Sequence, residues 1–403
     1  PQTYKVDALI TPLLPVNTGG ALPPGGYGSV TTYAGAESGG FADGNLTTAR
    51  FHRPTDIAFD AFGTLFVADR MNNAIRKITP NGTVTTLAGT GQSGYQDGPG
   101  NTAKFADPYT VTISPQDGNL YVSDNKFGYV RKITPAGLVS TVAGNGTKGA
   151  ANGPGSTASF GFLWGSAFDS KGNLFLADAS NAMIRKMLPD GTVSTFAGTG
   201  YSGRINGPAQ TATFSGPENV MIDANDNIYV ADPANGMIRK ITPDGMVSDL
   251  AGLGFHAYHD GPIASAGFYV PSGMIFDRYG NMLVADGVRI RKISPAGMVS
   301  TVAGGGAAEL INGTGDQAGF SRADGLALDE AGYLYVADEF SNVIRKVSLY
   351  GYSIDKPLPK GLKFNPETGA ITGTPTVMWP ETVYTVSSAP RTTVRPLRLV
   401  GRL

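Results

Sequence analysis

Residues 65–89 read LFVADRMNNAIRKITPNGTVTTLAG, and variants of this string return five more times along the chain. The aspartate that ends its first apolar run recurs in every copy, as Asp69, Asp124, Asp178, Asp232, Asp286 and Asp338. The arginine of its Ile-Arg-Lys run recurs as Arg76, Arg131, Arg185, Arg239, Arg291 and Arg345, at steps of 55, 54, 54, 52 and 54 residues. A fixed period of this length indicates a repeat architecture, in which each copy is one supersecondary unit.

Each copy contains four short runs with the pattern of β-strands, which in the first copy are residues 57–59, 65–68, 74–78 and 84–87. Turn residues separate these runs, as at Asp60 to Gly63 and at Pro80-Asn81-Gly82. No helical period is present. Four antiparallel strands in each unit predict the blades of a β-propeller.

The two ends of the repeat region are complementary. The sixth copy stops after residues 344–347 without its fourth strand, whereas residues 30–34 match a fourth strand that has no three strands before it. We therefore predict a six-bladed propeller over residues 29–348, in which the N-terminal strand completes the last blade, three strands plus one.

The longest connection in each copy has a constant length, which indicates packed framework. It runs from an Ala-Gly pair to a phenylalanine 16 residues after the glycine, and it passes an Asp-Gly or Asn-Gly pair. The repeated Asp and Arg are interpreted in the same way, the Asp as an acceptor of N–H groups in its own hairpin turn. A residue that is present in all six copies serves the fold, so a functional site should break the symmetry.

The symmetry breaks where the innermost strand of each blade begins. These strands lie nearest the propeller axis, and their first residues and the residues just before them vary between the copies. Aromatic, charged and amide side chains at these positions predict a mouth suited to a polar ligand such as a sugar or a peptide segment. A variable rim without any ligand is the other interpretation. The candidate ligand-binding residues are Arg53, Asp56, Tyr109, Trp164, Glu218, Asn219, Tyr269, Arg322 and Asp324.

Composition limits the other possibilities. The chain has 403 residues, a net charge of −1 and no cysteine, so disulfides, thiolate nucleophiles and Cys-based zinc sites are excluded. No apolar run approaches the roughly 18 residues of a membrane span. Only His52, His256 and His259 could supply imidazole ligands, as a metal site or as exposed loop histidines. We expect no metal, no cofactor and no catalytic residue.

The repeats resemble the NHL family, in which Gly-Asn-Leu-Tyr-Val-Ala-Asp precedes Ile-Arg-Lys-Ile, as in residues 172–178 and 184–186. Residues 357–362, 365–369 and 371–375 resemble a bacterial immunoglobulin-like domain. The resemblance implies a small β-sandwich formed by residues 1–28 and 349–390, with the propeller inserted between them. Residues 391–403 form a basic tail that departs from the family.

Together these resemblances imply an all-β, secreted or cell-surface bacterial protein, as one module of a longer chain. Because the sequence starts at Pro1 and not at Met, we expect a processed or trimmed piece from which any signal peptide is already gone. We expect non-enzymatic binding or adhesion to a glycan or a protein or peptide ligand. The alternative is a lyase or lactonase that uses the central channel. Nucleic-acid binding, which occurs in some NHL domains, is disfavoured by an isoelectric point near 6.4, and no membrane insertion is expected.

Overall fold

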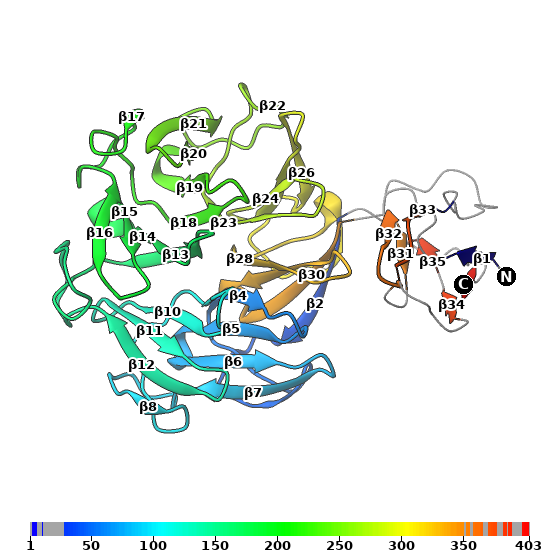
Figure 1. Ribbon diagram of the computed structural model, residues 1–403, viewed down its shortest axis with the longest axis horizontal. Helices are drawn as coiled ribbons and strands as arrows, with labels where there is room; N and C mark the ends of the chain where they lie inside the picture. Colours follow the sequence, from blue (N-terminus) through cyan, green and yellow to red (C-terminus); the bar gives the residue numbers. More distant parts are fainter. Residues whose placement is uncertain are drawn as a thin grey trace.

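The computed structural model describes residues 2–5, 10, 28–349, 352–354, 358–365, 370–376, 382–384, 386–388 and 397–402. Six antiparallel sheets form a ring around a central axis over residues 28–349 (Figure 1). This arrangement confirms the predicted six-bladed propeller. No described helix is long and apolar enough to cross a membrane.

Every blade has four principal strands, and five blades carry a short fifth strand at the outer edge. From the innermost strand outward, blade one is β4 (Pro54–Phe59), β5 (Leu65–Asp69), β6 (Ala74–Ile78), β7 (Thr83–Ala88) and β3 (Gly44–Asn45). Blade two is β9 (Thr112–Ile113), β10 (Leu120–Asp124), β11 (Tyr129–Ile133), β12 (Leu138–Ala143) and β8 (Gly98–Pro99). Blade three is β13 (Leu163–Phe168), β14 (Leu174–Asp178), β15 (Met183–Met187) and β16 (Val193–Ala197).

The other half of the ring repeats this order. Blade four is β18 (Asn219–Ile222), β19 (Ile228–Asp232), β20 (Met237–Ile241), β21 (Met246–Gly252) and β17 (Gly207–Pro208). Blade five is β23 (Pro271–Phe276), β24 (Met282–Asp286), β25 (Arg289–Ile293), β26 (Met298–Ala303) and β22 (Gly261–Pro262). Blade six is β28 (Ala323–Leu328), β29 (Leu334–Asp338), β30 (Val343–Ser348), β2 (Ser29–Gly35) and β27 (Gly313–Thr314). Single 3-10 turns are η1 (Arg70–Asn72), η2 (Ala179–Asn181), η3 (Pro233–Asn235), η4 (Gly315–Gln317) and η5 (Glu339–Ser341).

The ring closes through the N-terminal strand, as predicted. Strand β2 pairs antiparallel with β30, with Ser29 opposite Ser348 and Thr31 opposite Lys346. Val30 is buried in the core between blades five and six. The first strand of the repeat region therefore supplies both hydrogen bonds and core surface that the sixth copy lacks.

An identical polar framework holds every blade. The repeated Asp and Arg are fully buried and form an ion pair of 2.8–3.2 Å in all six blades. Each guanidinium carbon lies 5.0–5.4 Å from the centre of the ring of the repeated phenylalanine. The arginine also donates to the Asp or Asn of the long connection, which explains its constant length.

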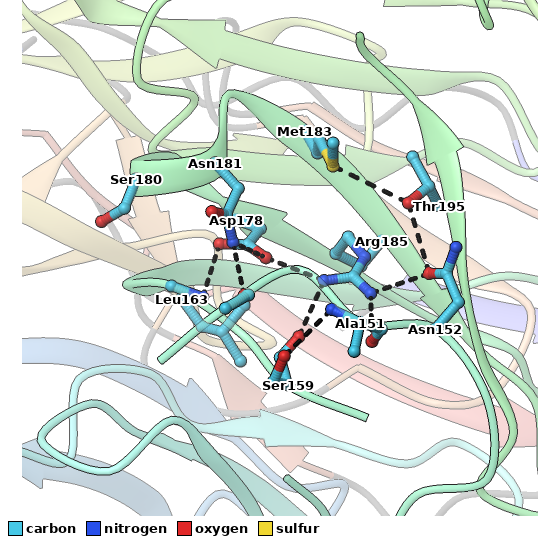
Figure 2. A network of polar contacts seen from close by, with 12 residues as sticks. Ala151, Asn152, Ser159, Leu163, Asp178, Ser180, Asn181, Met183, Arg185 and Thr195 are labelled. Atoms are coloured by element: carbon cyan, nitrogen blue, oxygen red, sulfur yellow. Dashed lines mark hydrogen bonds and ion pairs between the residues drawn. The ribbon is translucent and has the colours of Figure 1, made fainter. Parts of the chain in front are cut away.

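Blade three shows the network in detail (Figure 2). Asp178 accepts the Gly161 N–H at 2.9 Å and a bond from the Asn181 amide, while Arg185 donates to Asp178 and to Asn152. The N–H that this carboxylate accepts comes from the residue after the repeated phenylalanine, 17 positions upstream. The prediction that the Asp serves its own hairpin turn was therefore wrong. Instead it ties the long connection to the blade.

Among the described residues, seven strands lie outside the propeller sheets. They are β1 (Gln2–Lys5), β31 (Tyr352–Ile354), β32 (Leu362–Asn365), β33 (Ala370–Gly373), β34 (Thr382–Tyr384), β35 (Val386–Ser388) and β36 (Leu397–Arg402). β1 pairs parallel with β36, β36 pairs with β34, and the Ile10 N–H donates to the Gly373 carbonyl. The first residues of the chain thus pair with its last strand, which lies in the basic tail. Most of residues 6–27 falls outside the described part.

Candidate ligand site at the propeller rim

The six inner strands begin in a narrow throat on the axis. All six blades line it, with the residues Thr55, Asp56, Tyr109, Trp164, Glu218, Asn219, Ser272, Gly273, Asp324 and Gly325. The space between them is only about 10 Å³, close to the minimum that one water molecule needs. The propeller is therefore closed at this level to any larger molecule.

Close contact between neighbouring inner strands causes this narrowing. A Cβ at Gly165 would lie 2.6 Å from the Asn219 Cα, and one at Gly273 would lie 2.1 Å from the Asp324 carbonyl oxygen. A side chain at Gly325 would meet Asp56 in the same way. Glycine at these positions lets neighbouring blades approach closely at the axis. The pairs are blade three with blade four, blade five with blade six, and blade six with blade one.

A second cavity of about 280 Å³ opens beside the throat at the rim, and we call it the rim pocket. Its wall is formed by residues of blades six, one, two and three. The lining residues are Arg53, Arg70, Asp107, Tyr109, Asn125, Phe162, Trp164, Arg322, Glu339 and Phe340. On the other side of the throat, the channel widens into a basin of about 360 Å³ between the later residues of the inner strands, such as Val220 and Met274.

Aromatic side chains form one part of the rim pocket. The rings of Tyr109 and Trp164 stack nearly parallel, with centroids 5.5 Å apart and planes inclined by 11°. Tyr109 is buried and donates its hydroxyl to Asp324 at 3.0 Å, whereas Trp164 is partly exposed. Phe162 and Phe340 are exposed beside them. The pocket thus offers flat apolar surfaces next to polar groups.

Two arginines organise the charges of the site. Arg70 contacts Asp107 at 2.5 Å and Glu339 at 3.3 Å. Arg322 lies 3.3 Å from Glu339, 3.7 Å from Glu218 and 3.9 Å from Asp324. The pKa of Arg322 is raised, chiefly by the charge of Asp324. These arginines hold the carboxylates of three blades in one network.

The throat carboxyls resist ionisation. Burial, and then the charges of Asp324 and Glu339, raise the pKa of Glu218 well above its usual value. Burial also raises the pKa of Asp56 to about 7, although its carboxylate accepts the N–H groups of Val111 and Ile57 at 2.9 Å. An uncharged Glu218 can donate a hydrogen bond as well as accept one.

The structure brings eight of the nine predicted residues together. Asp56, Tyr109, Trp164, Glu218, Asn219 and Asp324 line the throat, and Arg53 and Arg322 join Tyr109 and Trp164 in the rim pocket. Tyr269 does not line either space. It is 46% exposed and stacks on Tyr258, with His256 at its edge.

Within the described residues, no three His, Asp or Glu side chains are arranged to hold a metal ion. His52, His256 and His259 are all exposed. The Nδ1 of the His259 ring lies 2.9 Å from the Ser265 carbonyl oxygen.

Comparison with known families agrees with the repeat pattern and the ring. Residues 38–206 match the Teneurin NHL domain model, and residues 333–396 match the model described as "Putative Ig domain". The chain is an NHL-repeat propeller joined to an immunoglobulin-like domain. Of the curated relatives, protein SUPPRESSOR OF QUENCHING 1 of Arabidopsis thaliana is 28% identical over 76% of this chain and 31% of its own length. Human NHL repeat-containing protein 2 is 28% identical over 71% of this chain and 45% of its own length.

The NHL propeller chain thus spans less than half the length of these curated relatives. Among solved structures, a structural genomics protein of unknown function from Bacteroides thetaiotaomicron is 24% identical, with a TM-score of 0.63 over 80% of this chain and 76% of that one. An auxiliary nutrient binding protein from Bacteroides ovatus is 16% identical, with a TM-score of 0.60 over 80% and 76% of the two chains. At these identities the likeness shows the fold.

The sequence-based candidates omitted six of the ten residues that line the NHL propeller's rim pocket: Arg70, Asp107, Asn125, Phe162, Glu339 and Phe340. Arg70, Asn125 and Glu339 each follow the repeated Asp, where the other three blades have Ala179, Pro233 and Gly287. This position breaks the repeat symmetry as clearly as the starts of the inner strands do. Comparing it across the six copies would have found all three residues.

Proposed function

We propose that this chain is a non-enzymatic binding module of a secreted or cell-surface bacterial protein, and that it recognises a glycan or a peptide at the rim pocket. One observation carries the proposal. The rim pocket is built from positions that differ between blades, while the surrounding framework is identical in all six. Solved structures of the same fold that are named auxiliary nutrient binding proteins support a binding role.

A glycan fits the geometry better than a peptide. Sugars present an apolar CH face and an edge of hydroxyl groups, and the pocket places the partly exposed Trp164 ring beside arginine, carboxylate and amide groups. The cavity of about 280 Å³ suits one or two sugar units and not a folded partner. A peptide segment is the second occupant to be tested.

The enzyme alternative gains less support. In the central channel, a lyase or lactonase would have the basin of about 360 Å³, which the throat of about 10 Å³ separates from the arginines of the rim pocket. The raised pKa of Glu218 would suit a general acid, but its carboxyl lines the throat beneath the rim pocket. Incubating bound ligands with the protein and measuring product release would detect such an activity.

The test of binding is replacement of Trp164 by alanine. A glycan array and a peptide array identify ligands of the wild-type protein, and titration calorimetry then measures their affinity. Trp164→Ala should weaken binding by about 2 kcal/mol or more, as loss of an aromatic anchor does. Tyr201→Ala, which removes an exposed aromatic outside the pocket, is the matched control. The proposal fails if the folded Trp164→Ala protein binds every ligand as the wild type does.

A further inference from the structure

Two donors on the wall of the rim pocket have no acceptor in the described part of the chain. The first is the amide nitrogen of Asn125. The Asn125 side chain is only 1% exposed, and its Oδ1 accepts the Leu163 N–H at 2.9 Å, but its Nδ2 has no hydrogen-bond partner. A buried donor without an acceptor has a free-energy cost, because it has lost its hydrogen bond to water. An acceptor atom of a ligand in the pocket would remove that cost.

The second donor is the Arg53 guanidinium. It lies 4.7 Å from the centre of the Phe340 ring, and no carboxylate of the described residues is within ion-pair distance of it. The Arg53 backbone is held in place, with a φ of 53° and an N–H that donates to the Asn342 side chain at 2.9 Å. The side chain lines the pocket and is open to solvent.

The acceptors of the pocket wall are already occupied. Asp107 is held by Arg70, and Glu339 is held by both Arg70 and Arg322. Arg322 also faces Glu218 and Asp324 of the throat, so among the described residues the one pocket arginine without a carboxylate partner is Arg53, and the free capacity of the wall is on the donor side. Such a wall favours a ligand that is rich in acceptors and carries negative charge, and a guanidinium matches the two oxygens of a carboxylate.

Building on the proposed glycan binding, we propose that the rim pocket selects sugars that carry a carboxylate, namely uronic acid units. Arg53 pairs with the sugar carboxylate, the Trp164 ring packs against the apolar face of the sugar, and the Asn125 amide donates to a hydroxyl or ring oxygen. Arg53 is then the residue that distinguishes acidic from neutral sugars.

The experiment compares matched pairs of ligands on the whole chain. Short oligomers of galacturonic, glucuronic and mannuronic acid are titrated beside their methyl esters, which keep the size and hydroxyl pattern but lack the charge. The variants are Arg53→Gln, Arg53→Lys and Asn125→Asp. The last of these keeps the acceptor for the Leu163 N–H but removes the free donor. Arg204→Gln removes a charge from a rim arginine that pairs with Asp249 outside the pocket, and it is the control. Melting temperatures verify folding.

We expect at least one acid to bind more tightly than its ester. Arg53→Gln should weaken binding of that acid by roughly tenfold or more and leave the ester unchanged. The affinity of Arg53→Lys for the acid should fall between those of Arg53→Gln and the wild type. Asn125→Asp should bind both the acid and the ester more weakly than the wild type does. Equal wild-type affinity for acid and ester would overturn acid selection while leaving glycan binding in place. An equal loss of acid and ester in Arg53→Gln would do the same, and failure to bind any glycan would overturn both proposals.

Discussion

A disulfide across the closing strand pair provides a direct test of how the ring is held. Thr31 and Lys346 lie opposite each other in the β2–β30 ladder, and opposite residues of an antiparallel pair are close enough for a disulfide. The chain has no cysteine, so Thr31→Cys with Lys346→Cys introduces one defined pair. The bond would close a loop of about 300 residues, for which the chain-entropy model gives roughly 6 kcal/mol of stabilisation.

That stabilisation should raise the melting temperature of the oxidised protein by roughly 10 °C over its reduced form. The substitution also removes the contact of the Lys346 amine with the Tyr333 ring at 3.9 Å, so Thr31→Ser with Lys346→Ser is the reference for that loss. Calorimetry with and without reductant gives the melting temperatures, and thiol titration shows whether the disulfide has formed. If the thiols of the folded protein stay free under oxidising conditions, or if oxidation leaves the melting temperature unchanged, the closing strand is not where we place it.

Three further predictions concern the framework and the throat. Removal of residues 1–35 uncovers the edge of blade six and should give aggregates in size-exclusion chromatography; a monomer that melts as the full chain does would contradict this. Asp178→Ala leaves a buried arginine unpaired and should cost about 3–5 kcal/mol in urea unfolding, while Asp190→Ala in an exposed turn should cost little. Because the pKa of Glu218 is raised in the fold, its contribution to stability is lost as pH rises through that value. The melting temperature of Glu218→Gln should therefore exceed that of the wild type by more at pH 8 than at pH 5. The substitution Glu309→Gln, at an exposed position, should show no such pH-dependent difference.

The repeat period was sufficient to predict the architecture. Turn residues and strand patterns recur at fixed spacing, and the unpaired strand at residues 30–34 matched the strand missing after residue 347. The pairing partners of the repeated Asp were not predictable in this way. The N–H that Asp178 accepts belongs to Gly161, and only the folded connection brings these residues together.

The candidate site was predicted in part, and the exceptions have a geometric reason. After each repeated phenylalanine, the second residue points into the rim pocket in four blades, as Arg53, Asp107, Phe162 and Arg322 do. Tyr269 belongs to blade five, which contributes no residue to the rim pocket, so its place in the ring keeps it away from the site. The sequence shows which positions vary but not which blades share a cavity.

The register of the closing pair also determines how the propeller would respond to pulling. Ser29 lies opposite Ser348, so the chain enters and leaves the ring at the same end of one strand pair. Tension applied through the flanking segments would act on that end first and separate the β2–β30 hydrogen bonds one after another. Strands loaded from opposite ends would instead resist with all their bonds at once. The propeller is therefore mechanically weakest at its own closure, and a pulled molecule would open there while the other five blades stay folded.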